Sequence, residues 1–336
     1  MQQYVCVRVP RMDDVNIALF DYDRYNTLYF FILNADEQIY LRYGGRDSAS
    51  PDTYLNLESI ELALQKGLEL HTDYQAGNIA KKPLPTPMYP KEIPLLVERT
   101  FARNQCVECH LIGDFLSQQR ENEGKLDKLT QMFRSPDIKN LGIYLDVPKG
   151  LVIKEAKGAV QTAGMQAVDR IMAFNGKTVW TFGDLLWELD QLPRTSKEAT
   201  FRVERDGKPL DLKVDLPPRW WFTDIRYKQL TVDPRVYFES TALRAEEKKS
   251  LGLKSDGFAS RVKYVSSFAE TLKSHQLKTG DVIVSVDGAE TDDVADTADF
   301  FIRLRKKAGD SVRLVVLRNG ERLEMPLQTF RMSFRK

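Results

Sequence analysis

The sequence predicts an α+β protein built from several domains, and the main observation behind this prediction is an internal repeat. Three segments in the second half of the chain recur in the same order at a nearly constant offset, which is the signature of a duplicated structural unit. Each copy combines apolar alternation, tight-turn signals and one helical stretch, as in a small α+β barrel or sandwich. A length of 336 residues also fits two or three domains. The matched segments are 141–143 with 251–253, 168–176 with 280–288, and 201–210 with 314–323.

The first predicted elements are a strand, an antiparallel hairpin and a closing helix within residues 1–72. Residues 4–9 alternate apolar and polar side chains, as a strand does. The apolar run at 27–33 and the segment 38–43 predict two strands joined by a turn at 34–37. The helix is predicted from apolar side chains at helical spacing, namely Leu57, Ile60, Leu64 and Leu68.

This block resembles the second half of a thioredoxin fold. The resemblance rests on the element order and on two short motifs, Asn34-Ala35-Asp36 and Arg42-Tyr43-Gly44-Gly45-Arg46. It implies a truncated thioredoxin-like half-domain without the first strand, the first helix and the Cys-x-x-Cys motif of that fold. Either the start of the chain is incomplete, or this is a trimmed relative that has lost redox chemistry. A sheet that is one strand short exposes an edge, which favours pairing with another chain.

A Pro-rich connector follows the N-terminal block. Five prolines lie between residues 81 and 94, so this stretch is expected to run extended and stiff. Residues 95–119 predict a helical segment that contains the motif Cys106-Val107-Glu108-Cys109-His110. Cys-x-x-Cys-His is the attachment motif of c-type haem, in which two thiols bind the vinyl groups and the imidazole faces the iron. Residues 73–139 are therefore predicted to be a linker and helical segment with a candidate haem c site.

Other chemistries fit the same cysteines. A dithiol or disulfide pair is one alternative, and two inert buried cysteines are another. In a zinc site, Cys106, Cys109 and His110 would need a fourth ligand from His71 or Cys6. If haem is bound, His110 is the proximal ligand and His71 is the preferred opposite ligand. His71 also fits a simpler role as a charged residue near a helix C-terminus. The other candidates for the opposite position are Met88, Met132 and solvent.

Haem attachment bears on the compartment. Because this attachment normally takes place outside the cytoplasm, a chain that carries haem is predicted to be extracytoplasmic, in a periplasm-like compartment. The sequence as given shows no export signal. Either the N-terminus is incomplete or the motif has lost its haem.

The two copies of the repeat carry the same kinds of element. Residues 281–286 alternate as a half-buried strand. One helix in each copy is predicted from apolar side chains at helical spacing. These side chains are Phe182, Leu185, Leu186 and Leu189 in the first copy, and Phe300, Phe301 and Leu304 in the second. Asn-Gly and Asp-Gly pairs supply the positive φ of tight hairpin turns. The pairs lie at 175–176, 206–207, 287–288 and 319–320.

Residues 140–217 and 250–332 resemble PDZ domains of the type found in HtrA-like proteases, without the protease domain. With the N-terminal block, they resemble thioredoxin-like, tandem-PDZ proteins of planctomycete-type bacteria. In PDZ domains, backbone N–H groups of a loop bind a peptide carboxylate, and the peptide adds as a strand beside a groove helix. The resemblance implies one such loop in each copy, at Leu141, Gly142 and Ile143 and at Leu251, Gly252 and Leu253. A bulky residue at either glycine is expected to weaken binding.

Residues 218–249 are predicted to link the two copies. The aromatic cluster at 218–222 is expected to pack one copy on the other. Residues 240–249 are expected to form a short charged helix. His275 lies inside the second copy and is expected on its surface.

The composition and motifs exclude several function classes. With 49 basic and 48 acidic residues, the charge gives no argument for binding nucleic acid or an anionic membrane. No window has the length and hydrophobicity of a membrane span. Nucleophile, phosphate-loop and metalloprotease motifs are missing from the sequence, so no catalytic residue is assigned and the chain is predicted not to be an enzyme.

Two functions of different classes remain. The first is a non-enzymatic scaffold whose tandem PDZ-like domains assemble or tether protein partners by peptide strand addition. The second is electron transfer by haem c at Cys106, Cys109 and His110. The chain is expected to form a homo-oligomer or to be a subunit of a redox complex. An absorption spectrum separates the two functions, because haem colours the protein.

Overall fold

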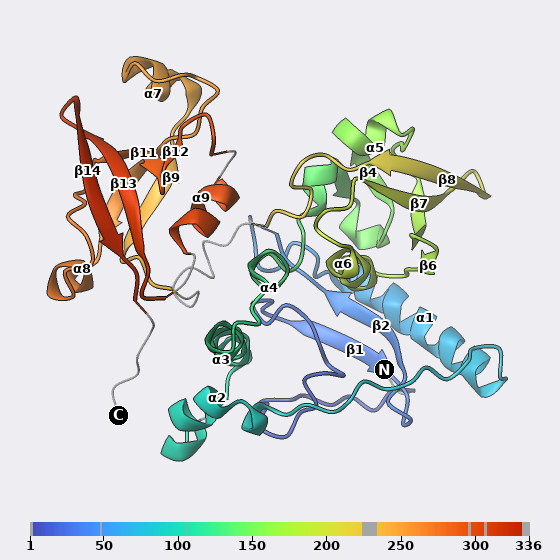
Figure 1. The fold of residues 1–336 in the computed structure, drawn as a ribbon. Coiled ribbons are helices and arrows are strands. Elements are labelled where there is room, and N and C mark those ends of the chain that lie inside the picture. Colours follow the sequence, from blue (N-terminus) through green and yellow to red (C-terminus); the bar gives the residue numbers. More distant parts are fainter. Residues whose placement is uncertain are drawn as a thin grey trace. The chain divides into compact units, whose positions relative to one another are not determined.

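A computed structural model of the chain describes residues 3–47, 49–105, 107–223, 234–294, 297–305 and 308–330. The chain folds into two compact units, drawn as ribbons in Figure 1. The first unit contains Met1–Gln119 and Leu126–Gln229, and the second contains Arg120–Lys125 and Leu230–Lys336. In the described residues, the first unit contains three antiparallel sheets and the second unit contains one, and both units contain helices.

The N-terminal part of the first unit is a hairpin covered by a helix, as the sequence predicts. Strands β1 (Tyr29–Leu33) and β2 (Ile39–Gly44) pair antiparallel. Helix α1 (Leu57–Gln75) begins at Asn56, whose side chain accepts hydrogen bonds from the first backbone N–H groups of the helix. Apolar side chains of the hairpin and of α1 form one core, which includes Ile32, Leu41, Tyr43 and Ala63.

The expected strand at residues 4–9 is not formed. Tyr4 is anchored on α1, where its hydroxyl donates to the carbonyl oxygen of Leu64 at 2.6 Å. Beyond it, Val5, Val7 and Val9 are exposed by 92, 80 and 52%. An alternating segment becomes a strand when one face meets a core and one edge meets a partner strand, and within the described residues this segment pairs with no sheet. The thioredoxin-like character of the N-terminal block therefore stays a prediction from sequence.

The helical segment expected over 95–119 is broken into short pieces. Residues 80–89 form neither helix nor strand, in line with their Pro content. The pieces end where the backbone turns, as at Asn104, which has a φ of +54°. The helical elements of residues 90–132 are η1 (Pro90–Glu92), α2 (Pro94–Arg99), η2 (Phe101–Arg103), α3 (Cys109–Asn122) and α4 (Lys128–Met132).

The first copy of the repeat, which we call the first repeat, contains the predicted strands, turns and helix. Its strands form two sheets, β3-β4 and β6-β5-β7-β8. Asn175 and Gly176 both have positive φ, as the predicted hairpin turn requires. Its elements are η3 (Ile138–Leu141), β3 (Ile143–Leu145), η4 (Val147–Lys149), β4 (Ile153–Ala156), α5 (Gly158–Thr162), β5 (Arg170–Phe174), β6 (Lys177–Thr178), α6 (Phe182–Gln191), β7 (Glu198–Arg205) and β8 (Lys208–Asp215).

The second copy, which we call the second repeat, forms one sheet in the order β14-β13-β11-β10-β9, with β12 paired to β11. Its buried core includes side chains from the sheet and from α9. Its elements are β9 (Phe238–Ala242), α7 (Ala245–Ser250), β10 (Ser260–Val265), α8 (Ser267–Thr271), β11 (Val282–Val286), β12 (Ala289–Glu290), α9 (Thr297–Leu304), β13 (Ser311–Arg318) and β14 (Glu321–Gln328).

The region expected to link the copies differs from the prediction in two ways. First, β9 belongs to the sheet of the second repeat, so the expected helix at 240–249 is a strand followed by the shorter helix α7. Second, the aromatic cluster packs inside the first unit. The indole N–H of Trp220 donates to the carbonyl oxygen of Ser196 at 3.2 Å, and Trp221 lies edge-on to Phe133 at 5.1 Å.

An ion pair with a buried carboxylate occurs at the equivalent place in both repeats. Nε and Nη2 of Arg205 donate to the two carboxylate oxygens of Asp169 at 2.7 Å each, and those of Arg318 donate to Asp281 at 2.8 and 2.7 Å. Each carboxylate also accepts a backbone N–H, from Gln166 or Lys278, at 2.8 Å. In each repeat the carboxylate therefore connects the start of one strand with the end of its neighbour. These strands are β5 and β7 in the first repeat, and β11 and β13 in the second.

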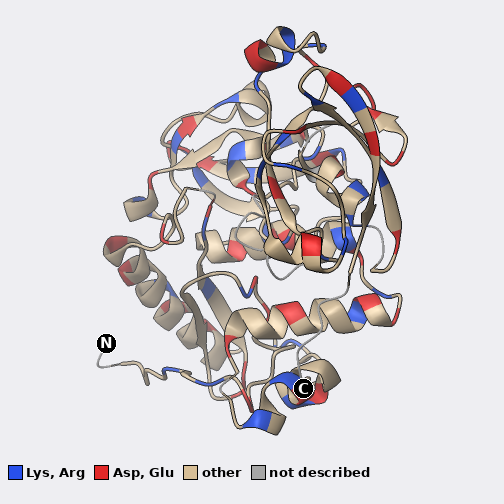
Figure 2. Ribbon diagram, turned by 90° about the vertical axis from the view of Figure 1, so that its left-hand side faces the viewer, with Lys and Arg blue, Asp and Glu red and all other residues tan. Residues whose placement is uncertain are grey.

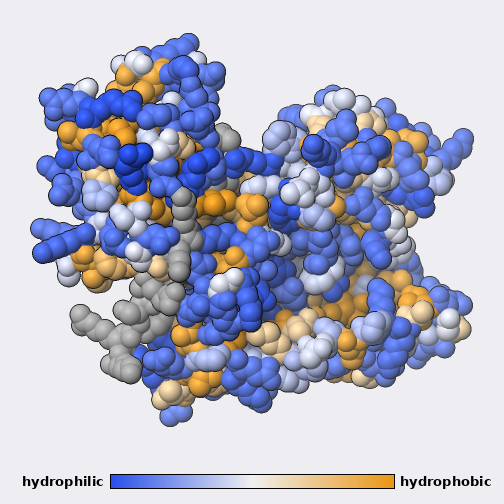
Figure 3. Space-filling view, in the orientation of Figure 1, coloured by the Kyte–Doolittle hydropathy of each residue, from blue (hydrophilic) through white to orange (hydrophobic). Residues whose placement is uncertain are grey.

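The surface agrees with the balanced composition. Acidic and basic residues are interspersed over the ribbon in Figure 2. Hydrophobic residues gather over the region of the N-terminal hairpin in the space-filling view (Figure 3). Among the helices of the described ranges, none combines the length and the apolar content needed to cross a bilayer.

Candidate functional site

The loop predicted in the first repeat lies where the sequence places it. Leu141 is buried, Gly142 has a φ of +88°, and Ile143 begins β3. The backbone N–H of Lys157, just after β4, donates to the carbonyl oxygen of Gly142 at 2.9 Å. A Cβ atom at position 142 would lie 1.9 Å from the carbonyl oxygen of Lys157, so this turn requires glycine.

Replacement of Gly142 by alanine is therefore expected to destabilise the first repeat by about 2–5 kcal/mol, from the positive φ and the collision together. The matched control is Gly252→Ala, because Gly252 also has positive φ but has open space around its missing Cβ. That control should cost only about 1–2 kcal/mol. Urea unfolding of the two full-length variants measures the difference, and equal losses would contradict the close approach of Gly142 to Lys157.

The equivalent loop in the second repeat is not at Leu251. The bond that closes the first loop has a counterpart after β10, where the N–H of Ser266 donates to the carbonyl oxygen of Tyr237 at 3.0 Å. Tyr237 has a φ of +55°, and Phe238 begins β9. Val236, Tyr237 and Phe238 therefore occupy the positions that Leu141, Gly142 and Ile143 occupy in the first repeat.

Leu251, Gly252 and Leu253 lie instead between β9 and β10, directly after α7. Leu251 caps the helix and is 38% exposed, and Leu253 packs against the small cluster that contains Leu243 and Ala259. A Leu-Gly pair suits the C-terminus of a helix as well as a loop before a strand, because both use positive φ at glycine. The sequence match between 141–143 and 251–253 was therefore not a structural match. The apolar triplet at 236–238 is the sequence feature that marks this loop. It was missed because it has Tyr237 where the first loop has glycine.

We give the name second groove to the region between the outer edge of β9 and helix α9 in the second repeat. Within the described residues, β9 ends the sheet and pairs only with β10. The N–H of Leu243 and the carbonyl of Tyr237 point toward β10. Main-chain groups alternate along an antiparallel strand, so those of Phe238, Ser240 and Ala242 point to the opposite edge. Helix α9 lies beside β9 (Figure 1), and its residues Phe300 and Leu304 share a core with Val236 and Phe238.

His275 holds the loop of the second groove and is half-buried, in contrast to its expected surface position. The N–H of Leu277 donates to Nδ1 at 3.3 Å, so the proton of the neutral ring is on Nε2. Nε2 lies 3.0 Å from the carbonyl oxygen of Val236 and donates to it. The ring also lies edge-on to Phe238, at 5.6 Å. Burial lowers the pKa of His275, although its hydrogen bonds to the backbone of Val236 and Tyr237 oppose this.

The second unit should lose stability as the pH falls below the ordinary His pKa of 6.5. Because the pKa of His275 is lower in the folded chain, the unfolded chain takes up a proton first. The contribution is thus fully present above pH 6.5 and is lost as the pH falls toward the folded pKa. His275→Gln keeps a donor for Val236 but does not titrate. Thermal unfolding of both proteins at several pH values should show a weaker pH dependence for the variant, and parallel curves would contradict this role.

The residues of the Cys-x-x-Cys-His motif do not form a metal cluster in the described part of the chain. Cys106 lies outside the described residues. Cys109 begins α3, and Nε2 of His110 lies 3.4 Å from the carboxylate of Glu108 at the surface. Nδ1 of His71 lies 3.0 Å from the hydroxyl of Tyr40. The described ranges contain no group of three His, Cys, Asp or Glu side chains placed to hold a metal ion. The haem c site stays a prediction, which an absorption spectrum of the purified chain would test.

Comparison with known proteins identifies one family. Residues 261–329 match the model of the PDZ domain. No curated protein matches the chain at a significant level. The matched range starts within β10, so the structure adds β9 and the loop at 236–238 to this domain.

Three similar solved structures are of the HtrA-type protease AlgW. A variant with a decapeptide is 20% identical, over 39% of this chain and 40% of that chain, with a TM-score of 0.26. AlgW with a decapeptide is 18% identical, over 48% and 54%, with a TM-score of 0.25. AlgW with a tripeptide is 18% identical, over 50% and 61%, with a TM-score of 0.25. The chain thus spans less than two thirds of the length of each of these proteins.

Proposed function

We propose that this chain is a non-enzymatic interaction protein whose second groove binds the C-terminal segment of a partner protein. The observation that carries this proposal is the outer edge of β9, which presents main-chain groups of Phe238, Ser240 and Ala242 in the same sheet as the residues that match the PDZ domain. PDZ domains bind peptides by adding them as a strand to such an edge. Main-chain hydrogen bonds then provide affinity, and side-chain pockets provide specificity.

The chemistry of the groove favours an apolar last residue with a free carboxylate. Val236, Phe238 and Leu304 are buried and form the apolar core beside the loop. An aliphatic or aromatic last side chain would extend this core. Arg235 directly precedes the loop and brings positive charge to its start. The guanidinium of Arg305, 3.8 Å from the ring centre of Phe301, is close enough to Arg235 to be affected by its charge. Positive charge at this end of the groove attracts a carboxylate.

The rest of the chain gives this domain a scaffold role. The first unit joins the N-terminal hairpin, the connector and the first repeat into one compact body. A partner bound at the second groove would thus be tethered to that body, as in an assembly subunit.

The test is a titration of the full-length protein with fluorescent decapeptides. The set ends in Val, Leu, Phe or Ala, and each peptide is made with a free and with an amidated C-terminus. Peptides with a free carboxylate should bind, and amidation should weaken binding about tenfold or more, because it removes the charge held by the loop. Equal binding of the free and amidated peptides, or no binding by the whole set, would contradict the proposal.

A further inference from the structure

The groove between β3 and α6, which we call the first groove, is filled by residues of the same chain. Tyr54, from the segment between β2 and α1, stacks on Phe182 at the start of α6. The two ring centres are 3.5 Å apart and the planes differ by 17°. Tyr54 is 4% exposed and Phe182 is 8% exposed. In the second repeat, the first residue of the groove helix is Thr297, which is exposed.

The backbone of the same segment lies directly on α6. Gly45 has a φ of +141°, and a Cβ atom there would lie 2.4 Å from Cε1 of Phe182 and 3.4 Å from Cδ2 of Leu186. Leu186 is one helical turn after Phe182, so Gly45 covers the face of α6 that a peptide would contact in a PDZ groove. The absence of a side chain at Gly45 allows this close approach.

Asp47 attaches the segment to the start of the first loop. Its carboxylate pairs with Nζ of Lys139, two residues before Leu141, at 2.5 Å, and its side chain is fully buried. The same carboxylate accepts hydrogen bonds from the N–H groups of Ala49 and Ser50 at 2.8 and 3.0 Å. The segment is therefore held in place at both ends, by Asp47 near the loop and by Tyr54 on the helix.

Strand β2 closes the N-terminal end of α6. The N–H of Arg42 donates to the carboxylate of Asp184 at 2.8 Å, and the hydroxyl of Thr181 donates to the carbonyl oxygen of Arg42. A Cβ atom at Gly183 would lie 2.5 Å from that carbonyl oxygen, so helix and strand are in contact here. The N-terminal block is thus packed on the groove helix over its first turn.

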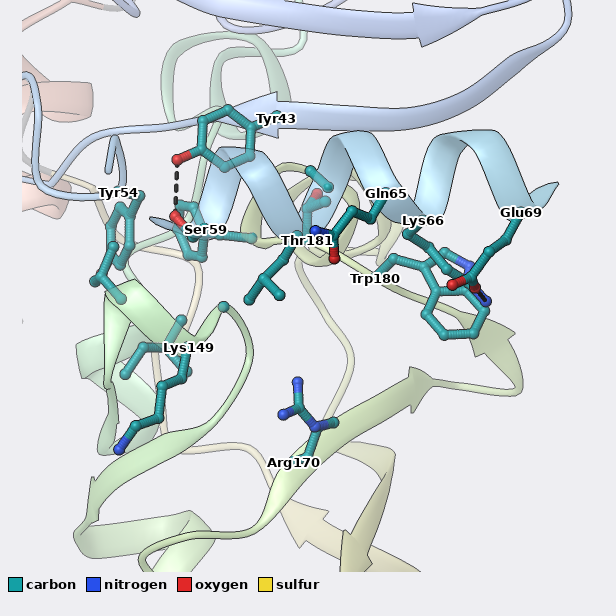
Figure 4. A pocket seen from close by; sticks show the side chains of 16 residues that line it. Tyr43, Tyr54, Ser59, Gln65, Lys66, Glu69, Lys149, Arg170, Trp180 and Thr181 are labelled. Atoms are coloured by element: carbon teal, nitrogen blue, oxygen red, sulfur yellow. Dashed lines mark hydrogen bonds and ion pairs between the residues drawn. The ribbon is translucent and has the colours of Figure 1, made fainter. Parts of the chain in front are cut away.

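A small cavity is the space that remains beside these contacts. It has a volume of about 240 Å³, and α1 closes it on the side opposite the first repeat, as Figure 4 shows. Its lining includes Tyr54, Leu145 and Phe182, as well as Trp180 and Lys66. Pockets that enclose a drug-sized ligand are about 300–1,000 Å³. The cavity is too small for several residues of an extended peptide.

From these contacts we infer that the segment before α1, through Gly45, Asp47 and Tyr54, is the resident occupant of the first groove, so that the chain offers one peptide site and holds a second one closed. This inference extends the proposed function, because it decides which of the two repeats binds partners. Loss of the contacts made by Tyr54 and Asp47 is expected to open the first groove. The fold of the first repeat itself does not depend on Tyr54 for its strands, which pair among themselves.

The test uses a decapeptide that ends in Val with a free carboxylate and carries a photo-reactive benzophenone. In the unmodified full-length protein, crosslinks should map to residues 234–330 and not to 141–191. In the double variant Tyr54→Ala/Asp47→Ala, crosslinks to 141–191 should increase about tenfold or more, because a larger fraction of the chain has an open first groove. The matched control is Tyr74→Ala/Asp36→Ala, which removes an exposed Tyr–Asp hydrogen bond of 2.8 Å elsewhere in the N-terminal block.

Three results would overturn the inference. These are crosslinks to 141–191 in the unmodified protein, a folded double variant without new crosslinks there, and an equal gain in the control. If the double variant does not fold, crosslinks to 141–191 in the unmodified protein and in the single variant Tyr54→Ala still test the inference. A protein that gives no crosslinks to 234–330, but gains them at 141–191 in the variant, would contradict the proposed role of the second groove and support this inference.

Discussion

Replacement of Asp169 by alanine should destabilise the first repeat by about 2–4 kcal/mol. The side chain of Asp169 is fully buried, and its two oxygens accept three hydrogen bonds, from Arg205 and from the N–H of Gln166. Loss of the carboxylate leaves the guanidinium, which is 27% exposed, without this partner. Because Asp281 has the same contacts in the second repeat, Asp281→Ala should destabilise that repeat to a similar degree.

The matched control is Asp211→Ala on β8, the strand that pairs with β7. Asp211 also pairs with an arginine of β7 through two hydrogen bonds, but both side chains are more than half exposed. Exposed ion pairs contribute little because water and salt screen them, so this variant should unfold at nearly the same urea concentration as the unmodified protein. Equal shifts for Asp169→Ala and Asp211→Ala would show that burial does not determine the strength of these pairs.

The carboxylates of Asp169 and Asp281 also make the stability of the fold depend on pH at low pH. Burial alone would raise the pKa of Asp169, but hydrogen bonds from Arg205 and Gln166 lower it overall below 3.8. A lowered folded pKa means that the contribution is present above pH 3.8 and is lost as the pH falls further. Asp281 has a lowered pKa for the same reasons, with Arg318 and Lys278 as partners.

Replacement of Ser240 by proline should weaken peptide binding at the second groove about 10- to 100-fold. The N–H of Ser240 points to the open edge of β9, where an added strand would accept its hydrogen bond. Proline removes this donor, and proline is tolerated at a strand edge, so the pairing with β10 should survive. The measurement is a titration with the Val-terminated decapeptide, with circular dichroism as a check on the fold.

Ser240→Ala is the control for this prediction. The hydroxyl of Ser240 accepts a hydrogen bond from Ser260 at 2.8 Å, and both substitutions remove it. Alanine keeps the backbone N–H, so its binding should stay within about threefold of that of the unmodified protein. If the alanine variant loses as much affinity as the proline variant, the peptide does not bind through the backbone of this strand.

Local signals in the sequence were sufficient for most of the regular elements. Asn175-Gly176 and Asp287-Gly288 adopt the positive φ that their turn requires, because few other residue pairs adopt it at low cost. The helix α6 begins at Thr181, whose side chain caps it, and buries the leucines that predicted it. Both the hairpin β1–β2 and α1 were predicted for similar reasons.

Features that depend on distant contacts were not predictable from the sequence. Tyr237 adopts positive φ without being glycine, so the Leu-Gly pattern pointed to Gly252 instead. Residues 4–9 have the pattern of a strand, but in the described structure they pair with no other strand. The cover on the first groove depends on Tyr54 and Phe182, which are far apart in the chain and carry no common motif. Tertiary packing decides such cases.

If the second groove binds partners while the first groove stays filled, as we propose, this asymmetry limits how strongly one chain can hold a partner assembly. Two linked sites gain avidity, because binding of one raises the effective concentration at the other. A chain in which Tyr54 and Gly45 fill the first groove has a valence of one, and its residence time on a partner is that of a single contact. Multivalent attachment then requires several copies of the chain, so the strength of tethering depends on how many copies are brought together.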